Sequence, residues 1–451
     1  MLFRSRPQRL LIAALTVPAL QLAIGGLLPA HAADAAALNP ADNTLVLMSS
    51  ALVLLMTPGL AFFYGGFVQG RNVLNTMAMS FVMMGIATVV WATFGFSLAF
   101  ADGGALQAVL GNPLRYSLLE NLPLSWEPLA IPGLSFALFQ GMFAIITPAL
   151  ISGALVERIS FRFWCLFTPI WLLLVYAPLA HMVWGGGLLG KDLDFAGGTV
   201  VHISSGVSAL VLAALIGARR QWPSSVRPPH DVTQILLGTG LLWFGWFGFN
   251  GGSQLTVAGA ELPFTTTHVA AAAGLVAWSL LETWRDGKPT AVGLATGAVG
   301  GLVGITPAAG FVTVGSSLAI GALTSLLCFI SVQVKVKLRF DDSLDTYAVH
   351  GVGGTAGALL TGVFANAELI AAHPAGEVLA QQGRTALVLG QLQAVLVAYG
   401  LAALGTLLIA AVLRSLGVRF RVSENAENLG VDVAEHGEEA YAERVGSPQL
   451  F

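Results

Sequence analysis

The sequence predicts an all-α integral membrane protein with eleven transmembrane helices. Three observations lead to this prediction: the composition, the number of long apolar segments and the placement of the basic residues. Hydrophobic residues make up 55% of the 451 positions and charged residues only 10%, and the mean hydropathy is +0.77. A soluble domain carries about 25% charged residues. The net charge of -3 gives no sign of a nucleic-acid partner, so membrane lipid is the expected surrounding.

Residues 1–32 have the form of a secretory signal peptide. Three arginines precede an apolar stretch that runs from Leu10 to Ala30, and small residues then frame a cleavage site that ends at Ala32. We expect cleavage there. The alternative is an uncleaved first span, which the prolines and glycines of the stretch disfavour. The remaining chain divides into a membrane domain, residues 33–414, and a polar C-terminal tail, residues 415–451.

Eleven apolar segments follow the signal peptide. A helix that spans a bilayer needs about 20 apolar residues, and polar or Pro/Gly-rich breaks separate most of these segments. The least distinct break lies at residues 307–310. The predicted spans are 44–68, 72–100, 132–155, 161–185, 196–217, 232–252, 263–283, 290–308, 311–334, 346–365 and 388–413.

The basic residues orient these spans. Cytoplasmic loops of membrane proteins carry an excess of Lys and Arg. With the mature N-terminus outside the cell and the C-terminus in the cytoplasm, only Arg115, Lys191 and Arg384 face outward. The inner side then holds Arg71, Arg158, Arg162, Arg219, Arg220, Arg227, Arg285, Lys288, Lys335, Lys337, Arg339, Arg414, Arg419, Arg421 and Arg444. This asymmetry favours the eleven-span count.

Two of the predicted spans contain a histidine in near-matching surroundings. His202 and His350 each follow an aspartate by eight residues, Asp194 and Asp342, and each follows a valine directly. If the intervening residues are helical, each histidine lies about 12 Å from its aspartate, well inside the bilayer. Ionisable groups at this depth mark transport pathways by default.

The spacing of the two histidines indicates an internal repeat. They fall in the fifth and tenth spans, and because five is odd, the two halves have opposite orientations. The prediction is an inverted five-plus-five helix repeat with an extra last helix, and its site lies near the midplane between the repeats. A lone buried histidine is more often a structural hydrogen-bond donor, but two at equivalent positions favour function. Neither span offers a further ligand one helical turn away, so no metal site is expected.

Aromatic residues are concentrated in nearby spans. Phe139 and Phe143 are four residues apart and share one helix face, and a run of five aromatics from Trp243 to Phe249 precedes Ser253. Trp184 ends the fourth span. An interfacial aromatic belt is one explanation for Trp184. Clustered rings beside a hydroxyl are also typical of a site for a small cation.

These segments resemble the signature of the ammonium transporter family, the Amt/Mep/Rh proteins, and specifically its bacterial Amt branch. The resemblance is carried by residues 194–202, 246–253, 139–143 and 345–354 and continues into the tail. It implies eleven helices around a pore in each subunit of a homotrimer. It also implies roles for individual residues. Trp184, Phe139 and Ser253 correspond to the outer ammonium site, Phe143 and Phe249 to the aromatic gate, His202 and His350 to the twin pore histidines, and Asp194 and Trp246 to supporting residues.

The expected function is ammonium uptake across the bacterial cytoplasmic (inner) membrane, without a cofactor. Removing a monovalent cation from water costs tens of kcal/mol by the Born estimate, and a cation–π contact returns only about 2 kcal/mol. We therefore expect ammonium to be recruited at the outer site and deprotonated, and ammonia to pass two mostly neutral histidines, with or without coupled proton transfer. Methylammonium is an expected second substrate.

The sequence also bears on functions other than transport and on partner proteins. An ammonium sensor with the same fold is the alternative, although the chain after residue 421 leaves no room for a signalling domain. An enzyme is not expected, because no Ser–His–carboxylate set is apparent. From its composition, the acidic tail is expected to be a solvated segment. The resemblance instead implies that it packs on the inner surface and helps a PII-type signal protein to dock.

Overall fold

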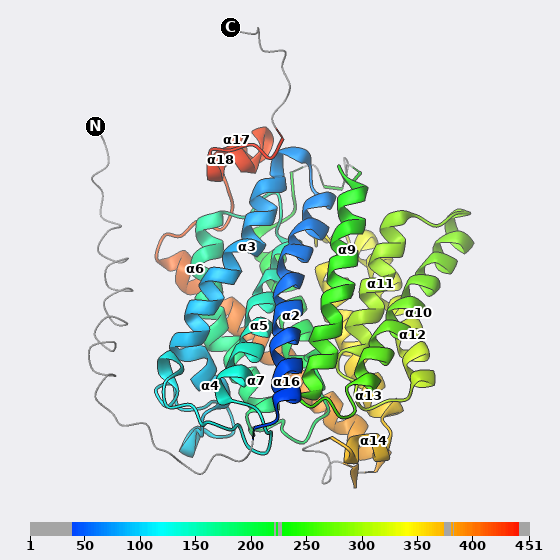
Figure 1. Cartoon of the computed structure of the whole chain (residues 1–451). Coiled ribbons are helices and arrows are strands. Elements are labelled where there is room, and N and C mark those ends of the chain that lie inside the picture. The colour runs from blue at the N-terminus through cyan, green and yellow to red at the C-terminus, as the bar shows by residue number, and fades with distance from the viewer. Residues whose placement is uncertain (1–37, 221, 224–227, 374–379, 382, 442–451) are drawn as a thin grey trace, which may run out of the picture.

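The computed structural model describes residues 38–220, 222–223, 228–373, 380–381 and 383–441. The predicted signal peptide, residues 1–32, lies outside the described residues. Within them the chain is helical, and its only β pairing is an isolated bridge between Ile159 and Arg421. The long helices run side by side in one bundle, with α17 and α18 at one end and α14 at the other (Figure 1).

Nine helical stretches of the described chain are long and apolar enough to cross a membrane. They are Pro40–Phe67, Gly70–Phe100, Gly133–Ala154, Phe161–Trp184, Gly198–Ile216, Val232–Gln254, Glu261–Asp286, Val314–Lys337 and Arg384–Ser415. Two shorter helical stretches complete the bundle: α11 (Ala291–Ile305), and η11 (Tyr347–Val352) followed by α13 (Gly353–Phe364). The ends of these eleven stretches lie within a few residues of the spans expected from the sequence.

Several of these stretches are built from more than one element. The second comprises α3 (Val73–Val90), η3 (Trp91–Gly95) and α4 (Phe96–Phe100), and the third is α5 (Gly133–Ile151) with a short last turn. The fourth comprises α6 (Phe161–Trp171), η7 (Leu172–Tyr176) and α7 (Ala177–Trp184). The fifth comprises η8 (Gly198–Ile203) and α8 (Ser204–Ile216), and the sixth α9 (Val232–Trp246) and η9 (Phe247–Gly251).

The remaining helices are continuous. They are α2 (Pro40–Phe67), α10 (Glu261–Asp286), α12 (Val314–Lys337), α16 (Arg384–Ser415), the short α14 (Ala367–Ala371), and α17 (Glu424–Leu429) and α18 (Val431–His436) of the tail. Side-chain caps set several boundaries. Asn39, for example, accepts hydrogen bonds from the backbone N–H groups of Ala41 and Asp42 at the start of α2.

The elements η3, η7, η8, η9 and η11 are π-helical turns. Such turns are rare and occur frequently at functional sites. Three of them carry residues that the sequence singled out: His202 lies on η8, Phe249 on η9 and His350 on η11.

Two glycines allow the histidine-bearing segments to cross at close range. A Cβ atom on Gly206 of α8 would lie 2.2 Å from the backbone N of Gly351. A Cβ atom on Gly354 of α13 would lie 2.9 Å from the carbonyl oxygen of Gly198 and 3.0 Å from the Cβ atom of His202. Each glycine follows its own histidine by four residues and packs against the histidine segment of the other half. Small residues permit such close helix packing.

The tail residues up to 441 pack on the bundle rather than extending from it (Figure 1). Asp432 accepts hydrogen bonds from the backbone N–H groups of Leu74 (3.0 Å) and Asn75 (2.8 Å) in the first turn of α3. Glu435 accepts one from Phe161 at the first residue of α6 (2.8 Å). Two tail carboxylates therefore cap the N-termini of two bundle helices. The solvated alternative for this part of the tail is wrong.

A network of buried ions lies at the same end of the bundle. Arg219 contacts Asp341 and Glu157, with N–O distances of 2.9 Å for each pair. Arg158 is fully buried and lies 3.7 Å from Asp341, and it donates to the carbonyl oxygen of Gly217. Burial raises the pKa of Asp341, but hydrogen bonds from Arg219 and the charges of Arg158 and Arg219 outweigh it and hold the pKa below its ordinary value. This network ties together three interhelical segments, those that follow the third, fifth and ninth membrane helices.

Candidate functional site: two histidines on a line of cavities

Three cavities follow one another through the bundle. The first, which we call the large cavity, lies at the end away from the tail and has a volume of about 380 Å³. The second and third have volumes of about 20 Å³ each. A void of about 10–15 Å³ of this kind is enough for one water molecule. Each small cavity therefore has room for one molecule of the size of water or ammonia.

The large cavity contains most of the residues expected at a cation site. Trp184 and Ser253 both line it, together with Phe143, Gln140 and Asp194. The Trp184 indole N–H is already used, because it donates to the carbonyl oxygen of Asp194 at 2.9 Å. Its π surface therefore remains as the group that could attract a cation. The Ser253 hydroxyl donates to the carbonyl oxygen of Phe249 at 2.8 Å, which leaves its oxygen free to accept a hydrogen bond.

Phe139 does not line this cavity. It is fully buried, and its ring packs edge-on against Phe143 with centroids 5.0 Å apart. The i, i+4 spacing does bring the two rings together, as the sequence indicated, but only Phe143 reaches the cavity. Phe139 supports the Phe143 ring from behind.

Two phenylalanines separate the large cavity from the first small one. Phe143 lines the large cavity and Phe249 lines the first small cavity. Their ring centroids are 4.4 Å apart, and both side chains are fully buried. The pair closes the route between the two cavities in this structure.

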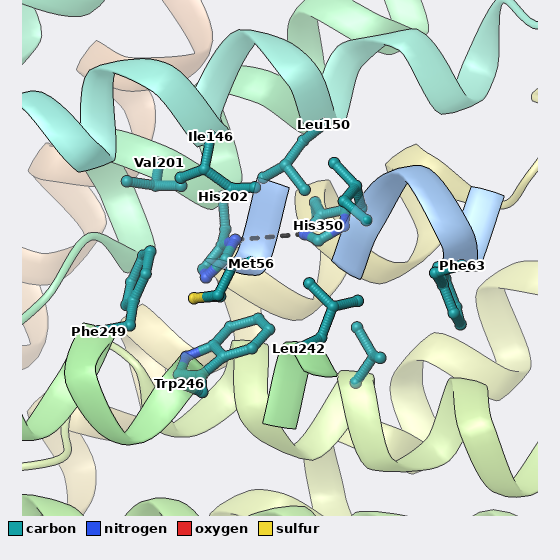
Figure 2. Close-up of a pocket in the computed structure, with 12 residues that line it drawn as sticks. Met56, Phe63, Ile146, Leu150, Val201, His202, Leu242, Trp246, Phe249 and His350 are labelled. Carbon is teal, nitrogen blue, oxygen red and sulfur yellow. Dashed lines mark hydrogen bonds between the residues drawn. The ribbon is translucent and has the colours of Figure 1, made fainter. Parts of the chain in front are cut away.

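Both histidines line the first small cavity, with mostly apolar neighbours such as Leu60, Ile146 and Val201. His202 and His350 face each other across it, with Trp246 and Phe249 beside His202 (Figure 2). Their Nδ1 atoms are 3.2 Å apart. His350 also lines the second small cavity, so it stands between the two.

Trp246 fixes the position of His202. The two rings are stacked with centroids 5.5 Å apart, and the indole N–H donates to the Thr306 hydroxyl at 2.9 Å. The Nε2 atom of His202 is buried without a hydrogen-bond partner among the described residues. Buried polar atoms are nearly always satisfied, so an unpaired one in a cavity marks a place for a small polar molecule.

The aspartates act as helix caps. The carboxylate of Asp194 accepts hydrogen bonds from the backbone N–H groups of residues 197, 198, 199 and 200, at 2.7–3.1 Å. Asp342 likewise accepts from Thr346 and Tyr347. The condition for the 12 Å separation of Asp194 and His202, a helix throughout the intervening residues, does not hold, because the helix begins only at Gly198. Asp194 lies before it and holds its N-terminus.

Two residues that line the large cavity were not among those expected from the sequence. His373 follows α14 and packs between Phe195 and Phe311, with ring centroids 5.7 and 5.5 Å away. Asp192 lies in the segment before η8. Both come from loops between helices. No motif or periodicity in the sequence indicates which loop residues turn toward a cavity.

Comparison with known proteins identifies the family. The profile described as the Ammonium Transporter Family matches residues 44–441. The chain belongs to the ammonium transporter family. It is 43% identical over 450 residues to the ammonium transporter of Mycobacterium tuberculosis, covering 91% of this chain and 92% of the relative. It is 44% identical over 407 residues to the ammonium transporter of Bacillus subtilis, covering 89% and 98%.

Solved structures of this ammonium transporter family share the fold. Saccharomyces cerevisiae Mep2 superposes with a TM-score of 0.81 at 34% identity, covering 91% of this chain and 93% of that one. A structure described as a sensor Amt protein gives a TM-score of 0.80 at 30% identity, covering 88% and 98%. The all-helical membrane fold of this chain is therefore that of the Amt/Mep proteins.

Proposed function

We propose that this member of the ammonium transporter family takes up ammonium by conducting ammonia through the line of cavities. The observation that carries the proposal is the meeting of His202 and His350, one from each half of the chain, in a small apolar cavity beneath a closed pair of phenylalanines. An intact cation would lose its hydration there at a cost of tens of kcal/mol. Moving neutral ammonia into the same cavity would cost only a few kcal/mol.

The large cavity is proposed as the recruitment site. Trp184 supplies a π surface and Ser253 a hydroxyl oxygen, and Phe139 holds Phe143 at the cavity floor. A cation–π contact of up to about 2 kcal/mol when desolvated is sufficient to concentrate ammonium but not to carry it through. The Phe143–Phe249 pair then acts as the gate. Ammonium releases its proton to water in the large cavity, at or above this gate, and ammonia alone passes below it.

Below the gate, the imidazole pair is proposed to bind ammonia. A neutral imidazole has one donor and one acceptor, so the shared bond between the Nδ1 atoms uses one of each. Of the two remaining Nε2 atoms, one can then accept a hydrogen bond from ammonia and the other can donate one to it. A proton that enters at the acceptor Nε2 of one ring would pass the shared proton to the other Nδ1, and the second ring would release its Nε2 proton on the far side. This sequence is the proposed route for coupled proton transfer.

The proposal includes the arrangement in the membrane. Counting the two shorter helical stretches, 291–305 and 347–364, as spans gives eleven, in an inverted five-plus-five repeat with α16 as the extra helix. The end that carries the tail and the buried Arg network then faces the cytoplasm, and the N-terminus faces outward across a bacterial inner membrane. A homotrimer is the proposed assembly, and a PII-type protein is a proposed partner at the cytoplasmic end.

Transport is favoured over sensing because the curated relatives at 43–44% identity are described as ammonium transporters. The test is uptake by the purified protein in proteoliposomes. Ammonium and methylammonium should enter at rates well above those of empty liposomes, whereas potassium should not, because potassium has no proton to release. Potassium flux comparable to ammonium flux would refute conduction as the neutral species.

A further inference from the structure

Three carboxylates line the large cavity: Glu127, Asp192 and Asp194. Asp194 is committed to four backbone N–H groups, so it has little left to offer a ligand. Glu127 is exposed at the surface. Asp192 is half-buried, and its carboxylate has no hydrogen bond or ion pair within the described part of the chain. It is the one partly sheltered carboxylate of this cavity that is free to act on a cation.

Asp192 is held in place by α16. Gln391, which is buried, accepts a hydrogen bond from the backbone N–H of Leu193 (2.8 Å) and donates to the carbonyl oxygen of Leu193 (2.7 Å). This clamp fixes the segment next to Asp192. A Cβ atom on Gly390 would lie 2.5 Å from Oδ1 of Asp192. The carboxylate therefore rests directly on the helix backbone, and its position is set by the fold.

We propose that Asp192 recruits ammonium to the large cavity, attracting the cation electrostatically before it reaches Trp184 and Ser253. This inference rests on the proposed function, in which the large cavity receives ammonium. A charge in a concave site with low-dielectric walls focuses its field and raises the local concentration of the opposite ion. Asp192 acts through charge, and its effect is on the apparent affinity rather than on the maximal rate.

The proposal predicts a pH dependence with a defined sign. Burial raises the pKa of Asp192 to about 6, so the carboxylate is charged above this pH and recruits ammonium there. Recruitment weakens as the pH falls below 6, while ammonium itself stays protonated throughout. Burial lowers the pKa of His373 to about 4, so this neighbour is neutral near pH 6 and adds no charge. The other charged groups nearby are Glu127, Asp194 and the exposed Lys191.

The test is the apparent KM for ammonium of Asp192→Asn in proteoliposomes. At about pH 7.5 the KM should rise roughly three- to tenfold, as expected for loss of one unit charge near the binding site. The maximal rate should change little. The wild-type KM should rise between about pH 7.5 and about pH 5 as Asp192 is neutralised, whereas the KM of the variant should stay nearly constant.

Two further variants make the result specific. Glu120→Gln removes the same charge from an exposed position that does not line the cavity, and its KM should equal that of the wild type. Gly390→Ala keeps the carboxylate but displaces it, so its KM should lie between those of the wild type and Asp192→Asn. An unchanged KM in Asp192→Asn, or a variant that keeps the wild-type pH trend, would overturn the role of Asp192. Absence of ammonium uptake by the wild type would instead overturn the proposed function.

Discussion

The Nδ1 atoms of His202 and His350 lie 3.2 Å apart, which joins the two halves of the chain by one hydrogen bond inside the bundle. Only one of the two Nδ1 atoms can carry the proton, so the rings adopt different tautomers. The close crossing at Gly206 and Gly354 makes this distance possible. The contact between the histidines therefore depends on how the two halves pack.

The crossing of the two halves should not tolerate a larger residue at Gly206. In Gly206→Ala the new methyl group would lie 2.2 Å from the backbone N of Gly351, so the helices must separate. Overpacking of this kind costs about 1–3 kcal/mol and should move the imidazoles apart. We expect a lower thermal midpoint in detergent and a large loss of ammonium uptake. Gly85→Ala is the matched control, because nothing lies within 4 Å of its Cβ position. Equal behaviour of the two variants would contradict the role of the crossing.

Trp184 should contribute to ammonium recruitment through its ring face. Replacing it with leucine keeps an apolar side chain but removes the π system, whose attraction is worth about 0.5–2 kcal/mol. The apparent KM for ammonium in Trp184→Leu should therefore rise roughly 3- to 30-fold. Trp284→Leu is the control, since Trp284 is 85% exposed and does not line the cavity. A KM that is equal in Trp184→Leu and the wild type would argue against a cation–π site.

The buried ion network should stabilise the end of the bundle next to the tail. Asp341→Asn leaves the fully buried Arg158 without its counter-charge and Arg219 with Glu157 alone, which should cost about 3–5 kcal/mol and lower the thermal midpoint. Because the folded-state pKa of Asp341 is lowered, its contribution is present above the unfolded value of about 3.9 and is lost as the pH falls through the folded value.

Below about pH 4, the wild type should therefore lose stability more steeply than Asp341→Asn does. Asp286→Asn serves as the control, because its partner Arg285 is partly exposed and such surface pairs contribute little. If Asp341→Asn is as stable as the wild type at neutral pH, the ion network is not important for stability.

The docked tail should depend on its capping carboxylates. Asp432→Asn removes the charge that interacts with the first turn of α3, and loss of a good cap costs about 0.5–2 kcal/mol. We expect limited proteolysis to cleave the tail faster in this variant. Glu438→Gln, at an exposed position of the same tail, should be cleaved at the wild-type rate. Equal resistance of the two variants to proteolysis would contradict the capping role of Asp432.

The spans and the twin histidines could be predicted from the sequence because their signal is local. A run of about 20 apolar residues has few interpretations, and an ionisable residue within one is rare enough to stand out. The equal spacing from Asp194 to His202 and from Asp342 to His350 also reflects a physical requirement. In each half the aspartate caps the helix that carries the histidine.

Other features of the site depend on tertiary packing and left no pattern in the sequence. The π-helical turns that carry His202, Phe249 and His350 have no known residue signature in this chain. The i, i+4 spacing placed Phe139 and Phe143 on one helix face, but it could not tell which ring lines the cavity. Asp192 lines the cavity in a segment whose neighbour, Leu193, is clamped by Gln391, nearly 200 positions later in the chain.

The most direct test of the central claim is ammonium uptake and electrical current measured together on the same proteoliposomes, for the wild type and for His202→Ala. The account predicts that removing this imidazole breaks the hydrogen bond with His350. The bond is part of the proposed proton route, so a loss of about 1–3 kcal/mol at the barrier to passage should lower any ammonium-driven current by roughly 5- to 150-fold while the protein remains folded. A His202→Ala variant that carries the wild-type current and uptake would contradict passage past the histidine pair.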